Sequence, residues 1–162
     1  MKKTYVIVGL GNRSSNFLEG ILQYREEADL LGLCDKNAGR LALKMAWAIE
    51  KGFSPKGYSD QQFDQMIKEL KPDVVLVTTT DSTHHKYICR AMELGCDVVT
   101  EKPMTTDIEK CKKIFEMQKK TGKTCRVTFN YRYAPARTQV KQMLLDGVVG
   151  EILSIDFNWM LD

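Results

Sequence analysis

The chain has 162 residues, of which 43% are apolar and 28% charged, an ordinary balance for one globular domain. This composition excludes disordered and fibrous proteins, and the net charge of +3 is too small to indicate a nucleic-acid partner. No run approaches the roughly 20 apolar residues that span a bilayer. The short apolar run after the first lysines does not resemble a signal peptide. We therefore expect a cytoplasmic protein with no membrane partner.

In chain order, short apolar runs alternate with helical patterns. Strands are predicted near residues 5–8, 30–34, 58, 74–77, 97–100 and 125–129, and helices over 14–25, 37–51, 60–70, 83–94, 106–122 and 135–146. The strands read as nearly continuous apolar segments, which is typical of strands buried on both faces. The alternation predicts an α/β fold with a doubly wound parallel sheet.

The first predicted strand runs into a glycine-containing loop and then a helix. Two glycines permit a tight turn and let a pyrophosphate approach the backbone at the helix N-terminus. Such a loop is the mark of a Rossmann-type domain, although a serine stands at its third small position. The residues expected to bind a dinucleotide are Gly9, Leu10, Gly11, Asn12, Arg13 and Ser14. The alternative is a plain glycine turn.

Asp35 ends the second predicted strand. A carboxylate there can accept hydrogen bonds from the adenosine ribose and would repel a 2′-phosphate. We therefore expect NAD as the cofactor in preference to NADP. The cations of Lys36 and Arg40 follow closely and weaken that preference. The alternative is a solvent-exposed aspartate.

A threonine-rich stretch follows the fourth predicted strand, at the sheet edge where open α/β sheets bind ligands. Thr79 and Thr80 are expected to contact the nicotinamide ribose. For His84, a cofactor contact and a structural place in the first helical turn remain equal alternatives.

The triplet Glu101, Lys102 and Pro103 follows the fifth predicted strand and should face the same crevice. The Lys102 ammonium could donate to a substrate oxygen and polarise or protonate it. Glu101 could set the orientation and charge of that lysine. The alternative is an ordinary surface lysine.

Taken together, these stretches resemble the Gfo/Idh/MocA oxidoreductases. The triplet is similar to that family's Glu-Lys-Pro signature, and the glycine loop and the threonine–histidine stretch match its other motifs, with Thr80 at a usual proline. Residues 130–135 and 147–151 resemble the family's later segments. The resemblance implies an NAD(P)-dependent enzyme with a sugar, polyol or inositol-like substrate. Lys102 would then be the catalytic lysine. Arg132 would lie near the active-site crevice and bind the cofactor, with a surface or structural ion pair as an equal alternative.

The last residues follow a different pattern. Apolar residues alternate with polar ones there, at Leu153, Ile155, Phe157, Trp159 and Leu161. This alternation is typical of a strand with one buried face. We expect a dinucleotide-binding domain over 1–130, then over 131–162 a connecting helix and the first strand of a missing α+β substrate domain. An apolar strand without a partner also favours a homo-oligomer.

The resemblance places the remaining catalytic residues in that missing domain, so this chain is expected to be inactive alone. Two alternatives remain open. Some enzymes of this architecture use NAD transiently to cleave glycosides, and a non-catalytic sensor could bind the nucleotide without using Lys102. The cysteines are too widely spaced for a disulfide framework, and no metal site is expected.

Overall fold

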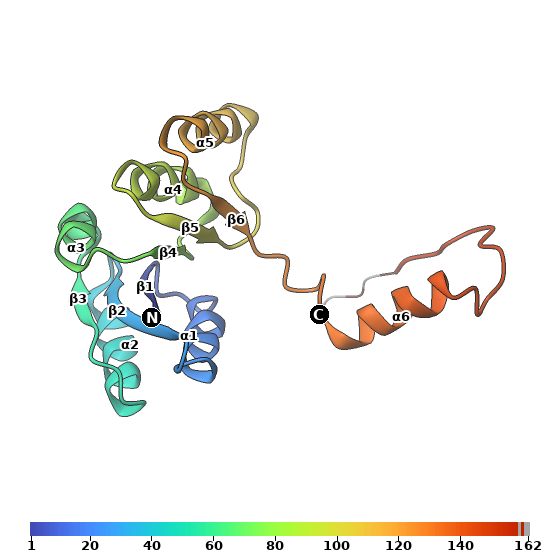
Figure 1. Cartoon of the computed structure of the whole chain (residues 1–162), viewed down its shortest axis with the longest axis horizontal. Helices are drawn as coiled ribbons and strands as arrows, with labels where there is room; N and C mark the ends of the chain where they lie inside the picture. The colour runs from blue at the N-terminus through green and yellow to red at the C-terminus, as the bar shows by residue number, and fades with distance from the viewer. Residues whose placement is uncertain (159, 161–162) are drawn as a thin grey trace. The chain divides into compact units, whose positions relative to one another are not determined.

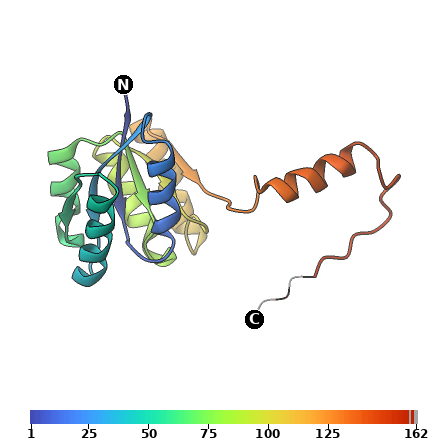
Figure 2. The same cartoon turned by 90° about the horizontal axis from the view of Figure 1, so that it is seen from below.

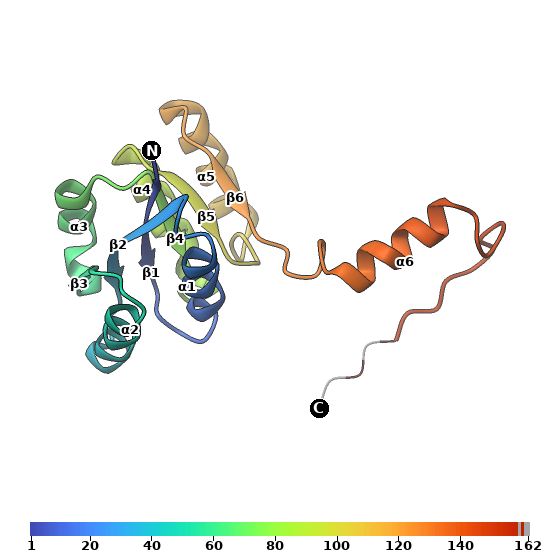
Figure 3. The ribbon, with the colours of Figure 1, turned by 60° about the horizontal axis from the view of Figure 1, so that its bottom comes forward.

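The computed structural model describes residues 1–158 and 160, and the chain divides into two compact units, Met1–Thr128 and Phe129–Asp162. The first unit contains a six-stranded sheet in the order β3-β2-β1-β4-β5-β6 (Figure 3). Its strands are β1 (Lys3–Val8), β2 (Ala28–Cys34), β3 (Lys56–Tyr58), β4 (Val74–Val77), β5 (Asp97–Thr100) and β6 (Cys125–Val127). All neighbouring strands are parallel, which confirms the predicted Rossmann-type α/β fold.

Five helices cover the two faces of this sheet (Figures 1 and 2). They are α1 (Ser14–Gln23), α2 (Ala38–Glu50), α3 (Phe63–Leu70), α4 (His84–Glu93) and α5 (Ile108–Thr121). Side chains alternate along β1, so that Val6 and Val8 pack with α3, α4 and α5, whereas Ile7 packs with α1 and α2. This two-sided burial explains why the strands read as continuous apolar runs.

Local capping chemistry sets several helix ends. The Asp107 side chain accepts a hydrogen bond from the Lys110 N–H at the start of α5, and Gly122 ends that helix in the left-handed region. Ser59 caps the turn that precedes α3, and α1 begins at Ser14 without a side-chain cap.

The strand order reverses direction between β1 and β4. The chain runs outward from β1 through β2 to β3, then returns to β4 on the other side of β1. At such a switch point the loops after the two strands diverge and leave a crevice at their carboxyl ends. Open α/β sheets commonly bind ligands in such a crevice.

The second unit contains α6 (Pro135–Leu145), which begins with Pro135 in its first turn as predicted. Residues 151–158 form no strand, although their alternation predicts one. A strand exists only through hydrogen bonds to a neighbour, and no other described segment pairs with this one. Trp159 and Leu161 of the same pattern lie outside the described residues. No helix in the described part of the chain is long and apolar enough to cross a membrane.

Candidate nucleotide site

A cavity of about 480 Å³ lies at the carboxyl ends of the central strands of the first unit. Residues from the loops after β1, β2 and β4 line it, together with the first turn of α4. They include Gly9, Gly11, Asp35, Arg40, Thr79 and Tyr87. The expected loop glycines, aspartate and threonines are therefore brought to one place.

The two glycines of the loop at residues 9–14, here called the glycine loop, serve different needs. Gly9 has a φ of +88°, and a Cβ there would lie 2.5 Å from the Thr79 backbone nitrogen. A Cβ on Gly11 would meet no atom within 4 Å. The protein itself thus requires glycine at position 9, whereas the open space over Gly11 leaves room for a ligand against the backbone.

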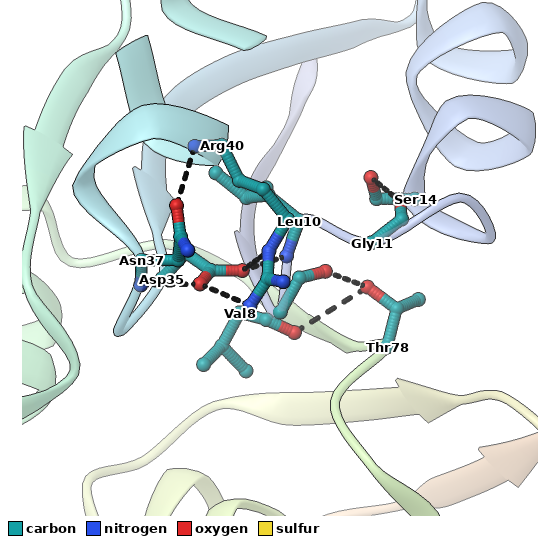
Figure 4. Close-up of polar contacts among 9 residues, drawn as sticks. Val8, Leu10, Gly11, Ser14, Asp35, Asn37, Arg40 and Thr78 are labelled. Atoms are coloured by element: carbon teal, nitrogen blue, oxygen red, sulfur yellow. Dashed lines mark hydrogen bonds and ion pairs between the residues drawn. The ribbon is translucent and has the colours of Figure 1, made fainter. Parts of the chain in front are cut away.

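Two side-chain hydrogen bonds hold this loop in shape. Ser14 Oγ donates to the Gly11 carbonyl oxygen at 2.7 Å, and Thr78 Oγ1 donates to the Gly9 carbonyl oxygen (Figure 4). The Ser14 side chain is fully buried. Serine therefore fits the position where a third small residue was expected, and it also fastens the turn.

Asp35 is buried rather than exposed, and its carboxylate accepts four hydrogen bonds (Figure 4). The Leu10 N–H donates at 2.6 Å and the Asn37 N–H at 2.7 Å. The Arg40 guanidinium donates through Nη2 at 3.0 Å and Nε at 3.3 Å, while nearly half of its side-chain surface remains exposed.

The surroundings of Asp35 keep it ionised. Burial by itself raises the pKa of this carboxyl, but the Arg40 hydrogen bonds and the two backbone N–H groups outweigh burial and hold it below its ordinary value. The result is a fixed anion at the end of β2 that also ties down the glycine loop through Leu10.

His84 is 1% exposed, and both of its ring nitrogens face backbone carbonyl oxygens. Nδ1 lies 2.9 Å from the Pro103 oxygen, and Nε2 lies 3.0 Å from the Thr79 oxygen. With no ring nitrogen left for a ligand, the structure favours the structural alternative for His84. The histidine connects the loop after β4 to the chain after β5.

Residues 101–103, here called the Glu-Lys-Pro turn, place a buried acid beside an exposed base. Glu101 is 5% exposed and accepts hydrogen bonds from Arg13 Nη2 at 2.7 Å, Thr128 Oγ1 at 3.2 Å and the Lys102 N–H at 3.2 Å. Lys102 is exposed. Glu101 thus contacts Lys102 through the main chain rather than through its ammonium.

The sequence analysis missed three neighbours of the site. Thr128 reaches Glu101 from the end of β6, and Lys86 and Tyr87 line the cavity from α4. Tyr87 follows Thr83, another lining residue, by one helical turn, and this spacing is the one signal that could have indicated it. Arg132 belongs to the second unit, where its guanidinium lies 6.0 Å from the Tyr133 ring, and its role near a cofactor stays a prediction.

A parallel sheet with a glycine loop and an acid at the end of β2 defines a domain of the dinucleotide-binding class. Residues 3–129 match the family model described as "Oxidoreductase family, NAD-binding Rossmann fold". The chain belongs to this family, the Gfo/Idh/MocA oxidoreductases, as its motifs predicted.

Two curated relatives and one solved structure illustrate the family. The putative oxidoreductase YteT of Bacillus subtilis is 35% identical over 162 residues, which are 99% of this chain and 38% of that protein. Glycosyl hydrolase family 109 protein 2 of Akkermansia muciniphila is 28% identical over 155 residues, 90% of this chain and 31% of that protein.

The structure is that of the WlbA dehydrogenase from Bordetella pertussis in complex with NADH and UDP-GlcNAcA. The two structures superpose with a TM-score of 0.81 at 25% sequence identity. The matched region covers 93% of this chain and 44% of the WlbA chain. This chain thus spans well under half the length of each of the three proteins.

Proposed function

We propose that this chain is the NAD-binding part of an oxidoreductase whose substrate is a sugar, a polyol or an inositol-like molecule. Its reaction would move a hydride between the nicotinamide of the cofactor and a carbinol carbon of the substrate. The observation that carries the proposal is the cavity over Gly11, which a buried, ionised Asp35 borders. The NADH and sugar nucleotide named for the WlbA complex support the same chemistry.

The cavity fits the adenosine and pyrophosphate parts of the cofactor. The pyrophosphate would lie over Gly11 at the N-terminus of α1, where the backbone N–H groups favour an anion. The adenosine ribose hydroxyls would donate to Asp35. Because all four acceptor positions of that carboxylate are occupied, Arg40 would give up its hydrogen bonds when the ribose binds.

We propose NAD rather than NADP as the preferred cofactor. The fixed negative charge of Asp35 would repel a 2′-phosphate at the position of the ribose hydroxyls. The cations of Lys36, Arg40 and Lys86 also line the cavity, so the preference would be a matter of degree. The loop residues, Thr79 and Thr80 would contact the cofactor; His84 would act by holding the backbone.

Lys102 is the proposed catalytic residue of this chain. Its backbone is held on both sides, through Glu101 and Pro103, while its side chain is exposed. When bound, the nicotinamide accepts or donates the hydride. Lys102 would hold the substrate oxygen and take or return the proton of its hydroxyl group.

Calorimetric titration of this chain with NAD and NADP tests the proposal. We expect NAD to bind and NADP to bind more weakly, and Lys102→Ala to bind NAD as the native chain does. Absence of NAD binding by the folded native chain would overturn the proposal. In a longer form of the protein that shows enzymatic activity, Lys102→Ala separates an enzyme from a sensor. Loss of activity at unchanged NAD affinity would identify an enzyme.

Glycoside cleavage with transient use of NAD is a second candidate, favoured by the similarity to the Akkermansia glycosyl hydrolase. The nucleotide site would be the same in both cases, because the hydride returns to the sugar before product release. Release of a leaving group without net formation of NADH would identify this reaction. Net NADH formation from a free sugar or polyol would identify the dehydrogenase.

A further inference from the structure

Arg13 and Glu101 form an ion pair between two loops of the first unit. Arg13 belongs to the turn between β1 and α1, and Glu101 follows β5, 88 residues further along the chain. The Nη2 and Oε1 atoms lie 2.7 Å apart, with 7% of the Glu101 side chain exposed and 40% of the Arg13 side chain. A carboxylate buried to this extent depends on its partner, because removal of the cation leaves an uncompensated charge.

The remaining bonds of Glu101 connect further segments. Oε1 also accepts from Thr128 after β6, and Oε2 accepts from the Lys102 backbone N–H. Because both oxygens are engaged by the protein, Glu101 is not placed to move protons during a reaction. Glu101 instead holds the Lys102 backbone N–H in a fixed position.

The other side of Lys102 is held independently. The Pro103 carbonyl oxygen lies 2.9 Å from His84 Nδ1, and the opposite nitrogen of that ring lies 3.0 Å from the Thr79 oxygen. The Glu-Lys-Pro turn is thus fastened to the loop after β4 through His84 and to the glycine loop through Arg13. The attachment through Arg13 joins the turn directly to the segment proposed to hold the pyrophosphate, whereas the attachment through His84 reaches that segment only by way of the loop after β4, where Thr78 donates to the Gly9 carbonyl oxygen.

We propose that Arg13 is a positioning residue, which sets the Glu-Lys-Pro turn at a fixed place relative to the glycine loop by its ion pair with Glu101. The inference rests on the proposed function. The turn would then form the wall beside the nicotinamide riboside, at a constant distance from the pyrophosphate. Arg13 acts through Glu101 and is not itself a ligand of the phosphates.

A competing role for Arg13 is direct contact with the pyrophosphate. Its Nε is buried and has no hydrogen-bond partner among the described residues, so one donor remains. The two roles differ in which part of the cofactor they affect. A phosphate ligand affects every adenosine diphosphate compound equally, whereas a positioning residue affects only compounds that carry the nicotinamide riboside.

The test is a pair of titrations, with NAD and with ADP, on the native chain and on Arg13→Ala, Arg13→Lys and Glu101→Gln. ADP retains the adenosine and the diphosphate but lacks the nicotinamide riboside. We expect Arg13→Ala to weaken NAD binding by about tenfold and ADP binding by less than about twofold. Arg13→Lys keeps the charge with a single donor group and should recover part of the NAD affinity.

A double variant checks the route of the effect. If Arg13 acts through Glu101, Arg13→Ala with Glu101→Gln should bind NAD no more weakly than the weaker single variant. Thermal unfolding of each variant serves as the folding control. If Arg13→Ala does not fold, a selective loss of NAD affinity in Arg13→Lys, with ADP unchanged, supports the proposal in its place.

Three results would overturn the inference. Equal loss of NAD and ADP affinity in Arg13→Ala or Arg13→Lys would make Arg13 a phosphate ligand. Unchanged NAD affinity in all variants would leave the ion pair without a positioning role. A folded native chain that binds ADP and not NAD, or neither, would remove the proposed function and this inference with it. In the first two cases the proposed function survives, because the native chain still binds NAD.

Discussion

Two buried carboxylates, Asp35 in the cavity wall and Glu101 in the Glu-Lys-Pro turn, are both attached to the glycine loop and differ in how they are held. Asp35 and Glu101 are each 5% exposed, each follows a strand of the parallel sheet, and each pairs with a half-exposed arginine. The partner of Asp35 is local, since Arg40 lies five residues away on α2. The partner of Glu101 is distant, since Arg13 lies in the glycine loop.

The difference shows how the fold secures the glycine loop. Asp35 holds the loop by its backbone, through the Leu10 N–H, and Glu101 holds it by a side chain, through Arg13. Asp35 can therefore bind the loop with any residue other than proline at position 10. The attachment at Glu101 depends on one residue type, so a single substitution can break it.

The largest effect is expected at Gly9, which precedes the Leu10 attachment and packs against the Thr79 backbone. Gly9→Ala would place a Cβ 2.5 Å from the Thr79 backbone in a conformation with φ of +88°. We expect the free energy of unfolding to fall by about 3 kcal/mol or more, because neither backbone can move cheaply. Chemical denaturation measures this loss. Gly11→Ala is the control, and a loss as large at Gly11 would contradict the distinction between the two glycines.

Removal of the Asp35 carboxylate should have the next largest effect on the free energy of unfolding. Asp35→Ala leaves the buried Leu10 N–H without an acceptor, which costs about 1–3 kcal/mol of unfolding free energy. It also removes the proposed ribose acceptor, so NAD affinity should fall by about tenfold or more. Calorimetry and denaturation measure the two losses. Unchanged NAD affinity in a folded Asp35→Ala chain would argue against the proposed adenosine site.

The pH dependence of stability provides a separate test of the Asp35 carboxylate. The pKa of Asp35 is lower in the folded chain than in the unfolded chain, so its ionisation stabilises the fold above the unfolded value of about 3.9. That contribution disappears as the pH falls through the folded value. We expect the gap in melting temperature between the native chain and Asp35→Asn to stay constant above about pH 5 and to shrink as the pH falls below about 4. A gap that grows on acidification would contradict the assignment.

A smaller effect is expected at Glu101 when the side-chain hydroxyl of Thr128, one of its uncharged donors, is removed. Thr128→Val deletes one hydrogen bond to Glu101 but leaves the ion pair with Arg13. The free energy of unfolding should fall by about 1–2 kcal/mol. A loss of unfolding free energy larger than that of Asp35→Ala would contradict this ranking of the two carboxylates.

The smallest effect on stability is expected at Lys102. Its side chain is exposed, so Lys102→Ala should change the free energy of unfolding by no more than about 0.5 kcal/mol. Lys102→Arg serves as the matched control that keeps a charge. A marked destabilisation by Lys102→Ala alone would show that the lysine supports the fold, and would weaken its proposed catalytic role.

Much of the architecture follows from the sequence alone. Continuous apolar runs such as Val74–Val77 define strands buried on both faces, and their alternation with helical patterns leads to a parallel sheet. Asp107 and Gly122 bound α5 by hydrogen-bond and backbone preferences that act within a few residues. The position of Asp35 at the end of β2 follows from the same local pattern. These properties are predictable because each depends on residues that are close in the chain.

Tertiary structure alone decided which groups are partners. No local pattern connects Arg13 to Glu101, brings both nitrogens of His84 against carbonyls, or joins the Leu10 N–H to Asp35. Residues 151–158 illustrate the same limit of local patterns. Their alternation predicts a strand, but a strand forms only when a neighbouring strand supplies its hydrogen bonds. The composition and local patterns of 162 residues determine a Rossmann-type domain. Contacts between segments far apart in the chain determine which of its charged residues hold the site in place.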